Sequence, residues 1–245
     1  MHLHHLHLPG LTRYAHAAHL QDTLVSRFLA HKASPSTNTA PAPTILTFQF
    51  HPVYTCGRRE ANSLSDSQIA YLRHRKGQES KDADIADFAY AARGGQTTFH
   101  GPGQLVAYPI LDLRQHGLTS RCYVHKLEES VIATCAHYGV SGFRTENPGV
   151  WTSRDEKICA VGVHLRRYIS SHGIGLNVTE EPMGWFQRIV ACGLEGKRAT
   201  ALELVMGKRV DRGVDEVAGM FVQEMARRLE GVAGIRAIGE DELGG

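Results

Sequence analysis

Four glycines, an arginine and a histidine lie within the twelve-residue segment Arg93-Gly-Gly-Gln-Thr-Thr-Phe-His-Gly-Pro-Gly-Gln104. Glycine lets the backbone come close to a ligand, and its free N–H groups can hold a carbonyl or anionic oxygen. A simple turn needs fewer glycines, so we interpret the segment as a ligand-binding loop. Its glycine spacing matches neither a dinucleotide-binding fingerprint nor a phosphate-binding loop that ends in Gly-Lys-Ser/Thr.

Two further segments combine reactive or flexible residues with a strand pattern. In Lys157-Ile-Cys-Ala-Val-Gly-Val-His164, the period of two places Lys157 and Cys159 on one face and Gly162 on the other. His172-Gly-Ile-Gly-Leu-Asn177 carries two glycines inside the next apolar stretch. Glycine weakens a strand, so we expect a ligand or another backbone to pass close at these positions. By itself, a lysine at the start of a strand is most often a solvated charge.

The chain has five cysteines, an odd number with no CxxC pair, which predicts free thiols in a reducing compartment. Cys122 and Cys135 fit the inner face of a predicted helix over 122–138, where cysteine acts as a small apolar residue. Cys192 fits no such stripe and is followed by a glycine, so we interpret it as an accessible thiol beside free backbone N–H groups. Cys159 stays an alternative nucleophile because it shares the face of Lys157.

These segments, together with Ala191-Cys-Gly193, resemble the motifs of the octanoyltransferases of lipoate synthesis, the LipB-type lipoyl(octanoyl) transferases. The motifs occur in the family's order, and the resemblance covers roughly residues 8–230. It implies that Cys192 is the acyl-thioester nucleophile and Lys157 its acid–base partner. It also implies an acyl-substrate pocket lined by Arg93, Gly94, Gly95, Gln96, Thr97, Thr98, Phe99, His100, Ala160, Val161, Gly162, Gly173, Ile174 and Gly175.

The family reaction moves an octanoyl group from octanoyl-acyl carrier protein to a lysine of a lipoyl domain. The acceptors are the lipoyl domains of 2-oxoacid dehydrogenase complexes and the glycine cleavage H protein. Thiol–thioester exchange conserves bond energy and aminolysis runs downhill, so we expect no ATP, no metal and no other cofactor. An ammonium beside the thiol would favour the thiolate, and the neutral amine of Lys157 could then deprotonate the incoming lysine. His100 is the competing base, because Cys–His pairing is the commoner way to activate a thiol.

Three other functions stay open. An ATP-dependent lipoate–protein ligase on the same fold would not need Cys192. A non-catalytic binder of acyl groups or lipoyl domains would tolerate the loss of the cysteine. A cysteine hydrolase would pass the acyl group to water. For the octanoyltransferase, we expect the missing side chains of Gly162, Gly173 and Gly175 to make room for the eight-carbon chain.

The composition is that of a globular protein, with 245 residues, 42% hydrophobic and 21% charged residues and a net charge of +2. This charge demands neither a nucleic acid nor a membrane partner, and no apolar run approaches the roughly 18–20 residues of a membrane helix. The histidine-rich start, 1–8, fits a half-exposed strand better than a metal site, because no cysteine or carboxylate lies nearby. Residues 1–21 hold no acidic side chain, as in transit peptides, and two long loops resemble eukaryotic members. We therefore expect a mitochondrial protein, with the cytoplasm as the alternative.

The hydrophobic pattern predicts helices over 12–31, 122–138, 183–190 and 214–229, and strands over 44–50, 86–92, 105–111, 157–165 and 168–178. Capping boxes at Ser65/Gln68 and Thr200/Glu203 predict two further helix starts, and Pro109 places its strand at a sheet edge or at the strand's own end. Strands mixed with helices that do not alternate regularly predict an α/β protein of the α+β type, with a mixed or antiparallel β-sheet core and flanking helices. The resemblance implies the catalytic fold of biotin and lipoate protein ligases. We expect one catalytic domain over 1–245, with loop insertions near 33–43 and 76–84.

Overall fold

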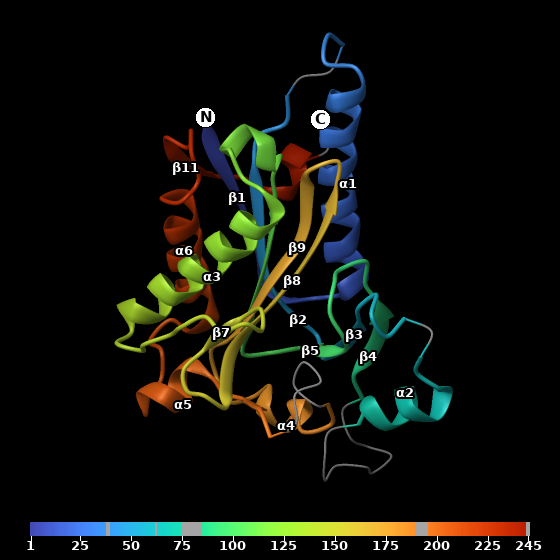
Figure 1. The fold of residues 1–245 in the computed structure, drawn as a ribbon, viewed down its shortest axis with the longest axis vertical. Coiled ribbons are helices and arrows are strands. Elements are labelled where there is room, and N and C mark those ends of the chain that lie inside the picture. The colour runs from blue at the N-terminus through green and yellow to red at the C-terminus, as the bar shows by residue number, and fades with distance from the viewer. Residues whose placement is uncertain (38–39, 62, 75–84, 190–195, 244–245) are drawn as a thin grey trace.

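The computed structural model describes residues 1–37, 40–61, 63–74, 85–189 and 196–243. Its centre is a large mixed sheet (Figure 1) in the strand order β10-β8-β9-β6-β2-β1-β11, with β7 paired to β8. The strands are β1 (His2–Thr12), β2 (Thr44–Phe50), β6 (Gln104–Ile110), β7 (Val150–Trp151), β8 (Glu156–Arg166), β9 (Ile169–Asn177), β10 (Arg198–Ala199) and β11 (Gly234–Ala237). The mixed sheet predicted from the sequence is therefore confirmed.

A second, three-stranded sheet lies beside the large one, in the order β4-β3-β5. It comprises β3 (Val53–Cys56), β4 (Asp87–Tyr90) and β5 (Thr98–His100). Its own small core joins Tyr54 and Phe99 to Trp185 of the short helix α4 (Met183–Phe186), and the rings of Phe99 and Trp185 stack at 5.1 Å. The glycine-rich segment 93–104 begins just after β4, contains β5 and ends at the first residue of β6.

Helices cover both faces of the large sheet (Figure 1). On one face, α3 (Ser120–His137) and α6 (Gly213–Ala226) pack together over a core of residues from β6, β8 and β9. On the other face, α1 (Tyr14–Ala33) buries Leu20, Leu24 and Phe28, one helical turn apart, against β2 and β6. In the described parts of the chain, the remaining helices are α2 (Asp66–Leu72), α5 (Leu202–Met206) and the 3-10 turns Leu113–His116 and Glu240–Leu243. No helix among the described residues is long and apolar enough to cross a membrane.

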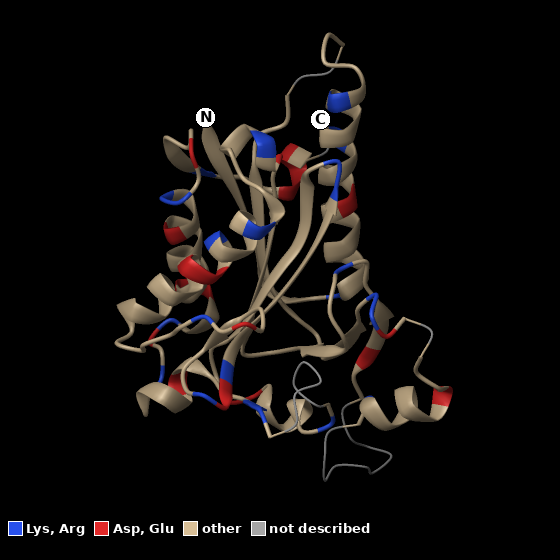
Figure 2. Ribbon diagram, viewed as in Figure 1, with Lys and Arg blue, Asp and Glu red and all other residues tan. Residues whose placement is uncertain are grey.

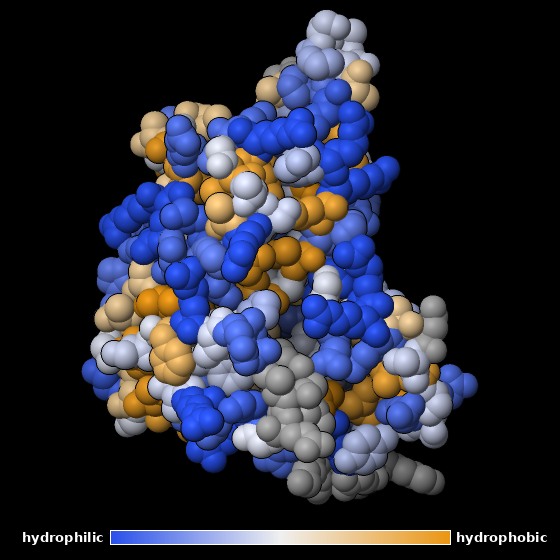
Figure 3. Space-filling view, viewed as in Figure 1, coloured by the Kyte–Doolittle hydropathy of each residue, from blue (hydrophilic) through white to orange (hydrophobic). Residues whose placement is uncertain are grey.

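The β8–β9 hairpin is the part of the sheet that matters most for the site. Arg166 pairs with Ile169, and both turn residues, Arg167 and Tyr168, have positive φ angles of 52° and 68°. Two left-handed residues in a two-residue loop match the right-handed twist of the strands they join. Lys and Arg occur at both ends of this hairpin (Figure 2), and hydrophobic residues reach the surface over its upper part (Figure 3). Val161, Val163 and Leu165 of β8 are only partly buried.

Several local predictions can be compared with the structure. The capping box of Ser65 and Gln68 is confirmed at the start of α2. The second box is wrong, because α5 begins after Ala201 and has no side-chain cap, and Glu203 instead accepts the N–H of Val210 at 2.9 Å. Pro109 lies near the end of β6, as one reading allowed, but β6 is a central strand between β2 and β9 and not an edge.

Helix α1 continues through Ala33, so the insertion near 33–43 begins one residue later than expected. The insertion at 76–84 lies outside the described residues. Cys122 is exposed in the first turn of α3, whereas Cys135 is buried, so the inner-face prediction is right for Cys135 and wrong for Cys122.

Candidate active site

A cavity of about 280 Å³ lies between the glycine-rich loop and the β8–β9 hairpin. The residues that the sequence assigned to an acyl pocket meet here from three separate parts of the chain. The cavity is lined by Arg93, Gly94, Gly95, Gln96, Thr97, Thr98, His100, Ala160, Val161, Gly162, Gly173, Ile174 and Gly175, and also by Lys157. Phe99 is the exception, because its ring points into the core of the small sheet against Tyr54 and Trp185.

Arg93 holds the glycine-rich loop in shape. Its buried guanidinium donates to the carbonyl and the hydroxyl of Thr55 at 2.6 and 2.7 Å, and to the carbonyl of Gln96 at 2.9 Å. Arginine suits this task because its planar group presents several donors at once. Sequence reasoning placed Arg93 in the pocket lining, and the structure adds that it clamps the loop to β3.

Two further contacts fix the loop over the cavity. The Glu60 carboxylate accepts the backbone N–H of Thr97 at 2.7 Å and the Thr97 hydroxyl at 2.6 Å. The backbone N–H of Gly94 donates to the carbonyl of Val163 on β8 at 3.1 Å. The loop is therefore tied to the turn after β3 at one point and to the β8–β9 hairpin at another, with the cavity between them.

His100 belongs to a buried chain of polar side chains. Its Nδ1 lies 2.6 Å from Gln104 Oε1, while Gln104 Nε2 donates to Asn177 Oδ1 at 2.8 Å and Asn177 Nδ2 donates to the Thr200 carbonyl at 2.9 Å. The amide orientations of this chain require His100 Nδ1 to be the donor. Burial and the nearby Arg93 charge lower the pKa of His100 to about 4. At neutral pH His100 is therefore an uncharged side chain that orders the cavity wall.

His172 is a cavity residue that sequence reasoning did not single out. It has a positive φ of 57° inside β9, and its N–H donates to Gln21 Oε1 of α1 at 2.6 Å. Its ring contacts Tyr108 edge-on, and its buried Nδ1 has no hydrogen-bond partner within the described part of the chain. Burial, followed by the Arg93 charge, lowers the pKa of His172 to about 3. The signal that could have found it was its place directly before two strand glycines.

Lys157 lies at the start of β8, with only 6% of its surface exposed. The default expectation of a solvated lysine is therefore wrong. Its Nζ donates to the Pro148 carbonyl at 2.7 Å and lies 5.3 Å from the centre of the Trp151 ring. Both contacts fix the ammonium beside the cavity, since Pro148 also lines it.

The three glycines of the hairpin face different neighbours. Gly162 pairs with Gly173, and Ala160 pairs with Gly175. A Cβ at Gly162 would lie 3.1 Å from Arg93 Cδ, whereas a Cβ at Gly173 would lie 2.3 Å from the Ala107 carbonyl oxygen. Gly173 is thus required by the close approach of the β6 backbone, whereas a side chain at Gly162 would require only that the Arg93 side chain shift by a few tenths of an ångström. The expectation that these missing side chains mainly leave open space is wrong for Gly173.

The thiol predicted as nucleophile, Cys192, lies outside the described residues. Ile189, the last described residue before that segment, lines the cavity, and so does Ala199 of β10. Cys159, the alternative nucleophile, is buried in the core between the sheet and α3, and its burial raises the pKa of the thiol well above the usual value. Cys159 is therefore unsuited to form a thiolate. Among the described residues, no three histidine, cysteine or carboxylate side chains gather as metal ligands.

The model of the lipoyl protein ligase A/B catalytic domain matches residues 13–226, and the chain belongs to this family. A Schizosaccharomyces pombe protein named "Probable octanoyltransferase" is 44% identical over 79% of this chain and 81% of its own length. The Xenopus tropicalis octanoyl-acyl-carrier-protein:protein N-octanoyltransferase LIPT2, mitochondrial, is 38% identical over 87% of this chain and 82% of its own.

The likeness extends to solved structures. A crystal structure of lipoate-protein ligase A bound with ATP superposes with a TM-score of 0.63 at 12% identity, covering 99% of this chain and 92% of the other. At this identity the likeness concerns the fold alone. It agrees with the fold class predicted from the sequence.

Proposed function

We propose that this protein transfers an octanoyl group from acyl carrier protein to a lysine of a lipoyl domain through a thioester on Cys192, with Lys157 moving the protons. Octanoyl transfer is the activity named for relatives that are 38–44% identical over most of the chain, and the protein is an acyltransferase of this group. The observation that carries the mechanism is the buried Lys157 ammonium, held 2.7 Å from the Pro148 carbonyl at the edge of a cavity that Ile189 and Ala199 also line.

In the first half of the cycle, the Cys192 thiolate attacks the carbonyl carbon of the octanoyl thioester. The new C–S bond forms as the bond to the phosphopantetheine sulfur of the carrier breaks, and the leaving thiolate takes a proton from the Lys157 ammonium. A free thiol titrates near 8.5, so the positive charge of Lys157 is needed to favour the attacking thiolate at neutral pH. This half leaves an octanoyl-enzyme and a neutral Lys157.

In the second half, the neutral amine of Lys157 takes a proton from the acceptor lysine, which arrives as an ammonium. The freed amine attacks the Cys192 thioester, the amide bond forms, and the C–S bond breaks to regenerate the thiolate. The second proton of the attacking nitrogen passes to solvent, which balances the reaction. One lysine that acts first as acid and then as base suits a ping-pong cycle.

His100 fits this chemistry less well than Lys157. With a pKa of about 4, His100 is a weak base and is uncharged at neutral pH. Its Nδ1 is also hydrogen-bonded to Gln104. We therefore assign His100 to the cavity wall.

The cavity supplies the apolar contacts that an acyl chain needs. The side chains of Val161, Ile174 and Phe186 line it, and each buried methylene contributes about 0.8 kcal/mol. We propose that the octanoyl chain lies along this wall and that the reaction uses no ATP and no metal. An ATP-dependent ligase on the same fold is the alternative, and pyrophosphate exchange with labelled pyrophosphate would reveal it.

The proposed acceptors are the lipoyl domains of 2-oxoacid dehydrogenase complexes and the glycine cleavage H protein. The site of action is mitochondrial, as in the name of the Xenopus relative. The experiment that tests the mechanism is intact-mass spectrometry after incubation with octanoyl-acyl carrier protein. We expect an added octanoyl group that maps to Cys192 and that leaves when a lipoyl domain is supplied. Octanoate release without acceptor would instead indicate a hydrolase, and transfer without any acyl-enzyme would contradict the proposal.

A further inference from the structure

The peptide bond between Pro148 and Gly149 is hydrogen-bonded at both of its ends by buried side chains. Its carbonyl oxygen accepts from Lys157 Nζ at 2.7 Å. Its N–H donates to Oε1 of Glu128, on α3, at 2.8 Å. One rigid, planar group therefore links a glutamate on a helix to the lysine at the start of β8.

The surroundings leave this arrangement little freedom. Glu128 is 3% exposed, and a buried carboxylate is expensive unless it is well paired. Gly149 has a φ of 127°, and a Cβ there would lie 2.2 Å from Lys157 Cε and 2.5 Å from the Cys159 carbonyl oxygen. Only glycine lets the peptide pass so close to the lysine stem. Gly149 is thus required by the position of Lys157.

The electrostatic sense of the contacts is uniform. The negative end of the peptide dipole, the carbonyl oxygen, faces the Lys157 ammonium, and the positive end, the N–H, faces the Glu128 carboxylate. Hydrogen bonds in such a chain polarise one another, by about 10–30% per bond in condensed-phase estimates. Glu128 therefore strengthens the hydrogen bond from Lys157 to the Pro148 carbonyl oxygen. It acts through the peptide group and does not contact the lysine itself.

We propose that Glu128 is the positioning residue for Lys157: it holds the Pro148–Gly149 peptide in the orientation whose carbonyl anchors Nζ at the cavity. The inference rests on the proposed role of Lys157 in proton transfer. That role requires the amine to give and take a proton at one place, and a displacement of about 1 Å can reduce a rate by about 10²-fold. The position of the Lys157 amine thus depends on Glu128 of α3, which acts through the Pro148–Gly149 peptide.

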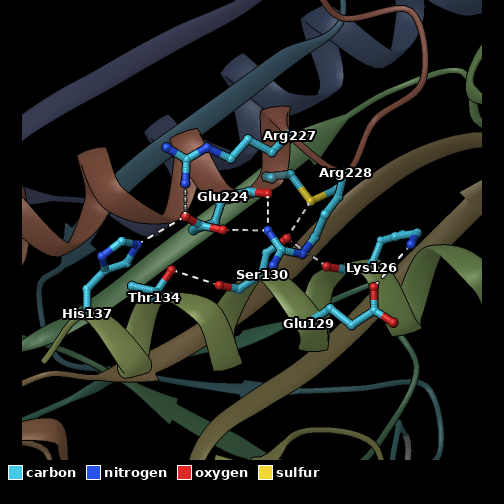
Figure 4. A network of polar contacts seen from close by, with 9 residues as sticks. Lys126, Glu129, Ser130, Thr134, His137, Glu224, Arg227 and Arg228 are labelled. Carbon is cyan, nitrogen blue, oxygen red and sulfur yellow. Dashed lines mark hydrogen bonds and ion pairs between the residues drawn. The ribbon is translucent and has the colours of Figure 1, made fainter. Parts of the chain in front are cut away.

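A matched control is available on the neighbouring helix. Glu224 of α6 is 4% exposed and accepts hydrogen bonds from His137 at 3.0 Å and from Arg228 at 2.6 Å (Figure 4). It joins α6 to α3, and the side chains bound to its carboxylate are His137, Arg227 and Arg228, all of them separate from the Pro148–Gly149 peptide (Figure 4). Glu224→Gln therefore reports what losing a buried, structural carboxylate does by itself.

The test compares Glu128→Ala, Glu128→Gln and Glu224→Gln in the full chain, by melting temperature and by steady-state octanoyl transfer to a lipoyl domain. We expect Glu128→Ala to lower kcat by about 10²-fold with a change in KM for the octanoyl donor below about threefold. Glu128→Gln should recover only part of that loss and stay about three- to tenfold below the original protein, because its neutral amide oxygen can still accept the Gly149 N–H but polarises the peptide less. Glu224→Gln should lower the melting temperature and leave kcat within about threefold of the original protein.

A double-mutant cycle then separates positioning from general damage. In a Lys157→Ala background, where rates are followed over hours, Glu128→Ala and Glu128→Gln should change the rate by less than about twofold, because the residue through which they act is gone. If Glu128→Ala does not fold, the same double-mutant cycle is measured with Glu128→Gln. In the presence of Lys157, this variant is expected to lower kcat by about three- to tenfold. An equal loss in both backgrounds, or an unchanged kcat in a folded Glu128 variant, overturns the proposal. Normal turnover by Lys157→Ala would contradict the mechanism itself, and the positioning role with it.

Discussion

The guanidinium of Arg93 donates to both the carbonyl and the hydroxyl of Thr55, at 2.6 and 2.7 Å. Through this pair the small sheet holds the glycine-rich loop above the β8–β9 hairpin. Arg93 is buried, and the same side chain packs against Gly162. The resemblance to the family placed Arg93 in an acyl pocket, but its guanidinium is largely engaged by oxygen atoms of the protein itself.

Arg93→Lys is expected to loosen the loop, because an ammonium on a flexible stem cannot reach Thr55 and Gln96 together. Each carbonyl left buried without a donor costs about 1–3 kcal/mol. The free energy of unfolding in urea should fall by that order, and KM for the octanoyl donor should rise. A variant with unchanged stability and KM would show that the loop is held by its other contacts alone.

Lys157→Arg is expected to fail almost as badly as Lys157→Ala, with kcat reduced by about 10²–10⁴-fold, the usual range for general acid–base catalysis. Arginine keeps the positive charge that favours the thiolate, but it does not give up its proton and cannot deprotonate an amine. The carrier thiolate can still leave and take its proton from water, so burst kinetics should show an octanoyl-enzyme that forms more slowly and does not turn over. Steady-state turnover near that of the original protein would limit Lys157 to an electrostatic role.

Cys192→Ser should abolish transfer, while Cys122→Ser should leave it nearly intact. A serine hydroxyl beside a lysine ionises poorly, so acyl transfer to the enzyme stalls. Cys122 is exposed on α3 and serves as the control for loss of a thiol. If Cys159→Ser removes activity in a stably folded protein and Cys192→Ser does not, the nucleophile has been misassigned.

Gly162→Ala and Gly173→Ala should differ in kind. At Gly162 the new Cβ meets the Arg93 side chain at 3.1 Å, which can shift, so the cavity narrows and octanoyl donors should suffer more than butanoyl donors. At Gly173 it meets the Ala107 backbone at 2.3 Å, so the strands must separate and both donors should lose activity with a lower melting temperature. The measurement is the transfer rate of each variant with octanoyl and with butanoyl donors. If Gly162→Ala reduces both rates equally, Gly162 is needed for backbone packing, as Gly173 is, and not for the acyl chain.

Stability should depend on pH through the buried histidines. The pKa of His172 is lowered from 6.5 to about 3 in the folded protein, so the unfolded chain binds the proton first as the pH falls. The stabilisation is present above pH 6.5 and is lost progressively as the pH falls toward 3, at up to about 1.4 kcal/mol per pH unit for one histidine. His172→Asn, which tolerates positive φ, should reduce that slope in urea denaturation between pH 6 and 4. An unchanged slope would mean that His172 is not buried in its neutral form.

Local patterns in the sequence were sufficient for the elements whose signals are local. The capping box at Ser65, the period of the helix that buries Leu20, Leu24 and Phe28, and the paired strands on either side of Arg167 are all visible in a short window. Each depends on neighbours a few residues apart along the chain. The glycine-rich loop could likewise be predicted to bind a ligand from its composition, and in the structure it lines the cavity. Its motif, together with those around Lys157 and Cys192, indicated the family.

Other features depend on contacts between residues far apart in the sequence, and only the tertiary structure decided them. Arg93 donates a hydrogen bond to the Thr55 carbonyl, and the Phe99 ring stacks on Trp185. Gly173 is needed because the backbone of Ala107 lies too close for a side chain. The burial of Lys157 and its link to Glu128 through the Pro148–Gly149 peptide have no signature in any window, because α3 and β8 meet only when the sheet has formed. A residue's type predicts the chemistry that it can do, whereas burial, pKa and orientation are set by neighbours that only folding brings together.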